Sequence, residues 1–411
     1  MMKPAQLCLW AMLPALLFFS CNEQAQNAGA VKNYPINQLT DSINKQFTSL
    51  VNTSYLPADS GMVAMAVYLK RGDELLVDTS YFFSNNNLPL PNGSTVFQMG
   101  SVTKTFTAAL IARQVNLGKM DLNGLAQTYL PTGGKVPLTL PDTYNREQAV
   151  ITLGNLATMN AGLARNAPVN NDTTPYPYAF RYLDTASLLY KPGSACNLYS
   201  NLGFAILGLV ACSQAYPNSA SYFSNYEKVV MDSLLNPLVM KDTRIFLNTA
   251  QMSRRAIPYG PKGGKTSYWN PNWPTNYAAG GLYSTLNDMR IYANEMTGQG
   301  SYLTKQDIDT LLKARGFVWS DMCKEKKDHY TAKQAMAWVV NADMKSSNDS
   351  SFNRFSKDGG VAGFSTYITF STPTINGVQY KAWVVLWANK KDFPVQSNAP
   401  KVMQVIYDLL K

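Results

Sequence analysis

Strand-like segments stand at both ends of this 411-residue chain, and the stretch between them is mostly helical. Near the N-terminus, apolar runs at 62–70 and 75–83 flank a polar turn at 71–74, a pattern that predicts a β-hairpin. Near the C-terminus, 363–371 and 380–388 form a second pair of strand-like runs. Because strands from the two ends have to bury their apolar faces, we expect them to share one sheet.

Apolar residues recur at helical spacing within 36–51 and within 400–410, which predicts a helix near each end. The expected fold is therefore α+β, with an antiparallel sheet built from about 36–100 and 352–411 and flanked by helices. The mostly helical stretch of about 101–351 is expected to form an inserted subdomain. The cleft between the sheet and this insertion is the expected place for a site.

Residues 1–21 have the pattern of an export signal: a lysine supplies the positive start, and 7–19 is an apolar core too short for a permanent membrane span. The run that ends at Cys21 resembles a bacterial lipobox. It predicts lipid attachment at Cys21 and a lipoprotein of the periplasm or outer membrane, with an ordinary signal cleaved nearby as the alternative. The polar stretch 22–35 is expected to be a tether that leads to one folded domain at 36–411.

The charged residues exclude several classes of function. The formal net charge is +10, but the cations are scattered, with no basic stripe interleaved with aromatic residues, so nucleic-acid binding is not expected. The single histidine, His329, lies in a run of mixed charge, which argues against a Ser-His-Asp triad. Cys196 and Cys212 flank an apolar run and are predicted to be buried thiols. No Cys or His spacing indicates a metal site.

The segment around Ser101 carries the first chemical signal. Gly100 precedes the serine, and apolar residues then recur at helical spacing, which places Ser101 in the first turn of a buried helix. Lys104 follows one turn later on the same face. A buried lysine with a lowered pKa can take the serine's proton, and the helix N-terminus offers N–H groups nearby. The Ser-x-x-Lys pattern is loose, since it recurs at Ser42 and Lys45.

Two further segments carry groups suited to acyl transfer. Tyr199 and Asn201 precede an apolar helix expected at 202–211; a phenol can relay a proton and an amide can hold a carbonyl. Lys357 to Gly360 precede the strand at 363–371. There a cation on an edge strand can bind a carboxylate, glycines allow close approach, and a backbone N–H can complete an oxyanion hole.

With these motifs in this order, the chain resembles the serine β-lactamase and penicillin-binding-protein superfamily over roughly 40–411. The match is to the branch of class C β-lactamases, D-alanyl-D-alanine carboxypeptidases and family VIII esterases. The motifs that carry it are Ser101-Val102-Thr103-Lys104, Tyr199-Ser200-Asn201 and Lys357-Asp358-Gly359.

The resemblance implies a β-lactamase/transpeptidase-like fold and an acyl-enzyme mechanism without metal or cofactor. It implies Ser101 as the nucleophile, Lys104 as its activating partner and Tyr199 as general base or proton relay. The substrate-binding residues that it implies are Asn201, Lys357, Gly359 and Gly360.

The chain departs from the family pattern in two places. The third motif is usually Lys-Thr-Gly in lactamases and often His-x-Gly in the esterase and peptidase relatives, whereas Asp358 here puts a carboxylate at the middle position. A carboxylate beside the pocket disfavours a substrate carboxylate, unless it points outward. The second departure is at Gly154, Asn155 and Met159, where relatives often carry basic and histidine residues; it is expected to concern support of the site.

The leading hypothesis is a serine hydrolase of the cell envelope that acts on an ester or a D-amino-acid peptide or amide. A catalytically silent relative that binds cell-wall peptides or a partner is an alternative, and a β-lactamase proper is another. The expected partners are a small-molecule or peptidoglycan-derived substrate and, through Cys21, a membrane. The oligomeric state is left open.

Overall fold

A computed structural model of the chain describes the following residues: 36–53, 61–85, 88–130, 150–166, 187–194, 197–217, 222–269, 276–317, 333–340 and 353–410. The predicted leader, the tether and Cys21 lie outside these residues, as do Cys196 and His329. Residues 36–411 form one compact unit. Among the described helices, none has the length and apolar character needed to cross a membrane.

The sheet that the sequence predicted joins the two ends of the chain. In the described residues its strand order is β2-β1-β11-β9-β8-β7-β6-β5, with β10 paired to β11. The hairpin β1–β2 docks through β1 onto β11, with Val67 opposite Val384. Every pairing is antiparallel, which confirms the expected α+β architecture. The long strands are β1 (Met62–Arg71), β2 (Glu74–Ser84), β8 (Arg354–Val361), β9 (Phe364–Ser371) and β11 (Val378–Ala388).

The middle of the chain also contributes to this sheet, which the predicted sheet segments of 36–100 and 352–411 did not include. Three two-residue strands from the middle extend its edge beyond β8. A separate short pair, β3 with β4, leads into the segment that carries Ser101. These short strands are β5 (Gly316–Phe317), β6 (Lys333–Gln334), β7 (Val339–Val340), β10 (Thr374–Ile375), β3 (Phe97–Gln98) and β4 (Tyr283–Ser284).

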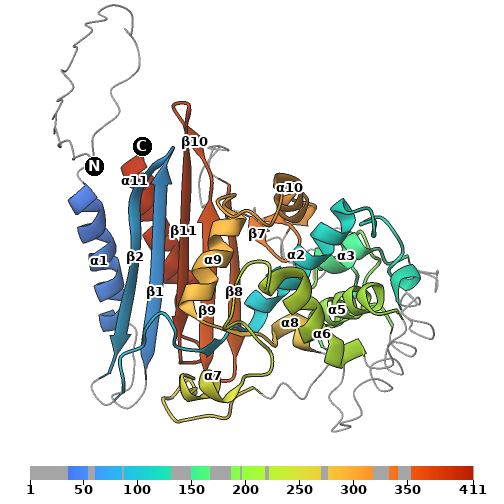
Figure 1. Ribbon diagram of the computed structural model, residues 1–411, viewed down its shortest axis with the longest axis horizontal. Coiled ribbons are helices and arrows are strands. Elements are labelled where there is room, and N and C mark those ends of the chain that lie inside the picture. Colours follow the sequence, from blue (N-terminus) through green and yellow to red (C-terminus); the bar gives the residue numbers. More distant parts are fainter. Residues whose placement is uncertain are drawn as a thin grey trace, which may run out of the picture. The chain divides into compact units, whose positions relative to one another are not determined.

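Side chains alternate between two apolar cores, one on each face of the sheet. On β1, Val63 and Met65 belong to the core shared with α1 (Ile36–Thr53) and α11 (Val395–Leu410), whereas Ala64 belongs to the other core. This is the two-residue period of a strand that is buried on both faces. Figure 1 shows α1 and α11 beside the strands and the remaining helices gathered on the side of β8 and β9.

The last helix begins earlier than the sequence predicted. The apolar spacing within 400–410 predicted a start at Pro400. Instead α11 starts at Val395 and Pro400 lies inside it. Val395 and Ala399 are both buried in the core that α11 shares with α1. Packing therefore keeps the turn before the proline helical, despite the missing N–H.

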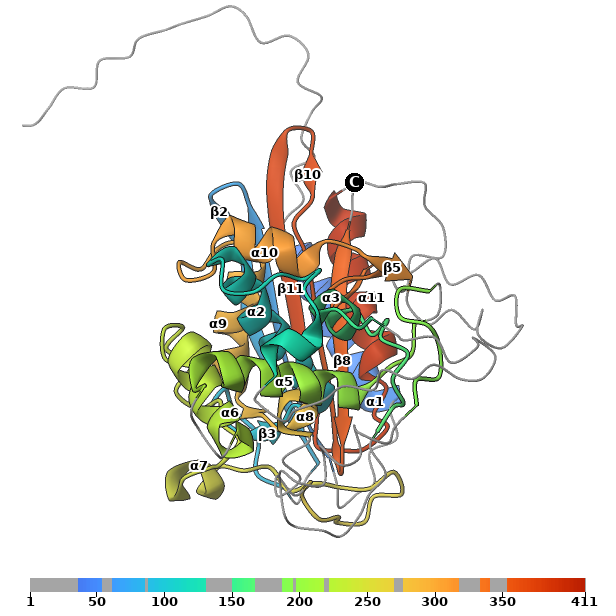
Figure 2. The ribbon, with the colours of Figure 1, turned by 90° about the vertical axis from the view of Figure 1, so that its right-hand side faces the viewer.

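The helices of the middle segment cover the other face of the sheet. The helix α9 (Leu286–Met296) contacts β1, β9 and β11, and Thr285 caps it by accepting from the backbone N–H of Asp288. Figure 2 shows α2, α5 and α8 on the side of the sheet that faces the viewer. The helices of this layer, besides α9, are α2 (Thr103–Asn116), α3 (Leu153–Ala157), α5 (Asn201–Ala215), α6 (Tyr222–Val230), α7 (Thr249–Ser253), α8 (Tyr277–Gly280) and α10 (Lys305–Leu312).

Candidate active site

Ser101 lies in a single 3₁₀ turn, Gly100–Val102, that runs directly into α2. Gly100 has a φ of +53°, which favours glycine, and a Cβ at this position would stand 2.8 Å from the backbone nitrogen of Gly360. Only glycine therefore lets the chain turn here while β8 lies against it. This agrees with the predicted position of Ser101 at the start of a buried helix.

Lys104 is fully buried beneath Ser101. Its Nζ donates hydrogen bonds to Ser101 Oγ at 3.1 Å, to Asn201 Oδ1 at 2.6 Å and to the Ala279 carbonyl at 2.6 Å. These partners match the three protons that an ammonium group can donate. Burial lowers the pKa of Lys104 to about 8, because desolvation disfavours the charged form. A lysine in this state can exchange a proton with the serine near neutral pH.

Tyr199 contacts the same hydroxyl from the other side, donating a hydrogen bond to Ser101 Oγ. Burial raises the pKa of the phenol, but the ammonium groups of Lys104 and Lys357 outweigh burial and lower it to about 8. Their Nζ atoms lie 4.9 and 5.3 Å from the centre of the Tyr199 ring. Two groups that both contact Ser101 Oγ thus titrate in the same accessible range.

The start of α5 fixes Asn201 beside this group. Ser200 caps the helix, accepting from the backbone N–H of Gly203 at 2.9 Å and donating to the Ala164 carbonyl at 2.8 Å. Asn201 gives its backbone N–H to the Arg165 carbonyl at 2.7 Å and its side-chain amide to Asn166 Oδ1 at 2.7 Å. Its Oδ1 accepts from Lys104, so the amide is held at both ends.

Lys357 is held by an internal partner. It is buried, at 3% exposure, and its Nζ donates to Asp358 Oδ1 at 3.0 Å, while Gln396 donates to Asp358 Oδ2 at 2.8 Å. The ammonium lowers the pKa of Asp358. Burial opposes the charge on Lys357, but the carboxylate outweighs burial and raises its pKa. The side chain of Asp358 is 43% exposed and lines the same cleft as Ser101 rather than pointing away from it.

The two glycines of the third motif have different surroundings. A Cβ on Gly359 would clash with the Met99 carbonyl and with the hydroxyl of Thr366, which donates to that carbonyl at 2.8 Å. Gly359 therefore lets β8 pack against the Ser101 turn. Around Gly360 there is space, since a Cβ there would meet only the Phe364 carbonyl at 4.0 Å.

Beyond its first three residues, β8 has an open edge. It pairs with β9 along its length, but β7 pairs with it only at Phe355 and Ser356. Among the described residues, no strand covers this edge from Lys357 onward, in agreement with the edge-strand position predicted for the third motif.

A cleft of about 710 Å³ opens over these groups. Five of the seven predicted site residues line it, and the other two, Lys104 and Asn201, lie behind it in the hydrogen-bond network. The structure therefore brings the three separated motifs together. The five lining residues are Ser101, Tyr199, Lys357, Gly359 and Gly360.

A family model described as beta-lactamase matches residues 48–405. The chain belongs to the beta-lactamase family. This confirms the resemblance inferred from the three motifs.

Curated relatives in this family match part of the chain. D-alanyl-D-alanine-carboxypeptidase/endopeptidase AmpH of Escherichia coli is 28% identical over 258 residues, which is 61% of this chain and 62% of that protein. A beta-lactamase of Pseudomonas fluorescens is 31% identical over 201 residues, 48% of this chain and 50% of that protein. The chain thus spans between half and two thirds of the length of these relatives.

Solved structures of the beta-lactamase family share the fold. A beta-lactamase/D-alanine carboxypeptidase from Yersinia pestis, complexed with citrate, superposes with a TM-score of 0.67 at 20% identity, covering 91% of this chain and 99% of that one. A class C beta-lactamase from Rhodobacter sphaeroides also gives 0.67, at 19% identity, covering 90% and 100%. These likenesses confirm the β-lactamase/transpeptidase-like fold.

Sequence reasoning missed several residues of this beta-lactamase-family site. Arg165 lines the cleft, Asn166 holds Asn201, the Ala279 carbonyl accepts from Lys104, and Gln396 holds Asp358. Arg165 and Asn166 come shortly after Gly162, which follows α3, and a glycine after a helix is a turn signal that could have placed them in a loop near the site. The role of the Ala279 carbonyl could not be predicted, because every residue type carries a backbone carbonyl.

The second departure from the family pattern, at 154–159, falls on α3 and its C-terminal turn. Asn155 forms a reciprocal capping pair with Thr152, and a Cβ on Gly154 would stand 3.0 Å from the Leu122 carbonyl. Met159 lines the cleft with a φ of +58°. The first two therefore support the local fold, as expected. Cys212, in α5, is a buried free thiol, as predicted.

Proposed function

We propose that this protein is a serine hydrolase that forms an acyl-enzyme on Ser101 and acts on an ester or a D-amino-acid peptide or amide of the bacterial cell envelope. One observation carries the proposal: the Oγ of Ser101 is contacted by both the Lys104 ammonium and the Tyr199 hydroxyl, each with its pKa lowered to about 8. Groups in a cleft whose pKa is strongly shifted by burial and by a specific charge partner are candidates for a functional site.

The proposed reaction has two halves. Ser101 attacks the substrate carbonyl, and its proton passes to the neutral Lys104 amine or the Tyr199 phenolate. Tyr199, on the open side of the serine, then protonates the leaving group. Water attacks the acyl-enzyme in the reverse sequence of proton transfers. The backbone N–H groups of Ser101 and Gly360 are the proposed oxyanion donors, and Asn201 orients the acyl group.

The third motif favours a hydrolase of esters or D-amino-acid peptides over an efficient β-lactamase. Asp358 puts a carboxylate into the cleft and occupies one side of Lys357, the cation that would otherwise meet a substrate carboxylate. The two curated relatives carry the names of a D-alanyl-D-alanine carboxypeptidase and a beta-lactamase, so both substrate classes belong in the test. A silent binding protein is disfavoured because Ser101, Lys104 and Tyr199 remain in mutual contact.

The proposal places the protein outside the cytoplasm. The leader pattern at 1–21 supports export, and the cysteine at its end supports a lipid anchor at Cys21. Metabolic labelling with a fatty acid, compared between the wild type and Cys21→Ala, tests the anchor. Label of equal intensity in the variant contradicts it.

The activity is tested with a fluorophosphonate probe and a small panel of esters, D-Ala-D-Ala peptides and β-lactams. We expect the probe to label the wild type and to leave Ser101→Ala unlabelled. Ser42→Ala is the matched control, because Ser42 belongs to the second Ser-x-x-Lys pattern, in α1, and should label like the wild type. Absence of label on the wild type, or equal label on Ser101→Ala, removes the proposal.

A further inference from the structure

Among the described residues, three cations lie over the Tyr199 ring, and they are not equivalent. Lys104 is fully buried and directs its protons to three internal acceptors. Lys357 is buried and paired with Asp358. Arg165 is exposed, lines the cleft, and places its guanidinium carbon 4.8 Å from the centre of the Tyr199 ring. Within the described part of the chain, no carboxylate forms an ion pair with Arg165.

The backbone fixes where Arg165 stands. Its carbonyl accepts from the first backbone N–H groups of α5, Asn201 at 2.7 Å and Leu202 at 3.4 Å. The neighbouring Ala164 carbonyl accepts from Ser200. The backbone of Arg165 is therefore held against the start of α5, the helix that also carries the Asn201 amide. A guanidinium held over the Tyr199 ring in this way is positioned to bind a ligand in the cleft.

We propose that Arg165 binds a carboxylate on the leaving group of the substrate, an inference that rests on the proposed hydrolase function. Guanidinium groups match carboxylates through two parallel hydrogen bonds. The leaving group is the part of the substrate nearest Tyr199, because the phenol protonates it, and Arg165 lies against that ring. Because Asp358 neutralises Lys357, Arg165 takes over the anion binding that the third motif would assign to Lys357.

Lys391 is the competing candidate, because it also lines the cleft and is exposed. It stands just before α11, next to Asp392, whose carboxylate lines the same part of the cleft. No contact joins Lys391 to Tyr199 or to Ser101 among those described. Among the cations that line the cleft, Arg165 is therefore the one that contacts the Tyr199 ring and forms no ion pair with a described carboxylate.

The test uses two aryl esters with the same acyl group, one with 3-carboxyphenol and one with 3-carbamoylphenol as the leaving group. We expect the wild type to prefer the carboxylate ester in kcat/KM by about tenfold or more, the strength of a charge-assisted pair. Arg165→Gln should remove most of this preference, and Arg165→Lys should restore part of it. Arg71→Gln, at the distant end of β1, is the matched control for loss of an arginine and should keep the preference. Thermal unfolding verifies that each variant is folded.

The outcomes separate this inference from the proposed function. Acylation of Ser101 by both esters with no preference in the wild type, or an unchanged preference in Arg165→Gln, overturns the role of Arg165 and leaves the hydrolase intact. A preference lost in Lys391→Gln but not in Arg165→Gln also overturns it. If neither ester acylates Ser101, the proposed function fails and the inference fails with it.

Discussion

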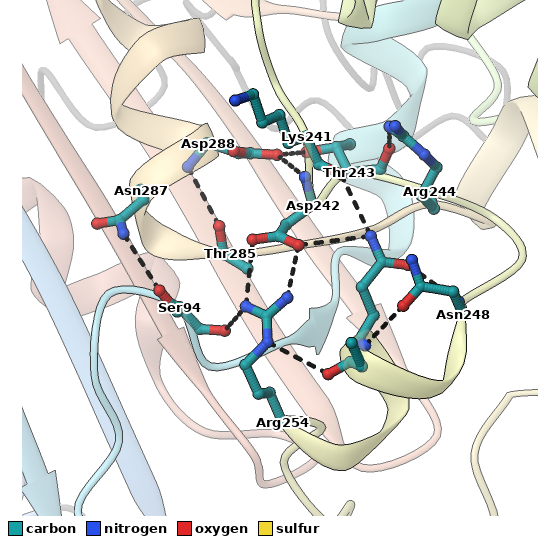
Figure 3. Close-up of polar contacts among 12 residues, drawn as sticks. Ser94, Lys241, Asp242, Thr243, Arg244, Asn248, Arg254, Thr285, Asn287 and Asp288 are labelled. Carbon is teal, nitrogen blue, oxygen red and sulfur yellow. Dashed lines mark hydrogen bonds and ion pairs between the residues drawn. The ribbon is translucent and has the colours of Figure 1, made fainter.

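Two polar clusters of this molecule hold charged groups in opposite ways. One surrounds Ser101 in the cleft. The other, shown in Figure 3, joins the segment before and after α7 to the start of α9. There Arg254 donates to both oxygens of Asp242, at 2.6 and 3.1 Å, and the buried Asp288 accepts from the Asp242 backbone and from the Thr243 hydroxyl at 2.7 Å.

The difference lies in which charges are neighbours. In the Asp242 cluster the hydrogen bonds from Arg254 lower the pKa of Asp242, so the carboxylate stays in its ordinary ionised form. In the cleft, burial lowers the pKa of Lys104 to about 8, and the cations around Tyr199 outweigh its burial and lower the pKa of the phenol to about 8. Pairing opposite charges holds a fold together, whereas crowding cations around a weak acid prepares proton transfer. Substitutions in the two clusters should therefore have opposite consequences.

Lys104→Met should give the largest effect. It removes the buried amine at nearly constant volume, and we expect kcat/KM for an activated ester to fall by about 10⁴-fold, as for loss of a member of a catalytic unit. Loss of the ammonium leaves the Ala279 carbonyl and the Asn201 amide oxygen without a donor, but it also removes the cost of burying a charge, so the free energy of unfolding should decrease by less than for Asp288→Ala. Ester kinetics and denaturant unfolding measure the two. Loss of stability with activity retained would reverse the distinction between the clusters.

Tyr199→Phe should follow, with kcat/KM lower by about 10² to 10³-fold, the size of a general acid–base contribution. The ring that Lys104, Lys357 and Arg165 face remains, so the fold should be kept. Acylation and deacylation rates from single-turnover kinetics locate the loss. A variant with wild-type rates in both steps would remove Tyr199 from the reaction.

Asp288→Ala should have the opposite effect, lowering the stability of the fold while leaving the activity almost unchanged. It leaves the buried Thr243 hydroxyl and the Asp242 N–H without their acceptor, which should lower the free energy of unfolding by about 2 kcal/mol. The folded fraction should keep its ester kinetics within about twofold, because the cluster does not line the cleft. A large loss of kcat at unchanged stability would show that the second cluster takes part in the chemistry.

The smallest effect is the pH dependence. Lys104 or Tyr199 can accept the serine's proton only when deprotonated, so kcat/KM should fall about tenfold per pH unit below about 8 and level off above it. The phenolate raises the pKa of Lys104, so in Tyr199→Phe the remaining limb should move to lower pH. A pH-independent rate would contradict the assignment. Because the two groups are coupled, the limb belongs to the pair.

Particular residues show how far the sequence could predict this molecule. The apolar runs at 62–70 and 380–388 predicted strands that do pair, and Gly100 with the helical spacing after it predicted the turn into α2. The two-residue strands β5 to β7 are too short to have a period, and the start of α11 depends on burial of Val395. The hydrogen bond from Lys357 to Asp358 depends on the orientation of the two side chains on β8, which the sequence does not specify. The place of Arg165 depends on the backbone that caps α5, which residue type does not encode.

The central claim is that Ser101 is the group that carries the acyl chain. We would quench the reaction with a p-nitrophenyl ester at a pH near 8 and map the adduct by peptide mass spectrometry. The predicted result is one acyl group on the peptide that contains Ser101, present in Ser42→Ala and absent from Ser101→Ala. An acyl group on any other residue, or ester turnover that persists in Ser101→Ala, would contradict the account.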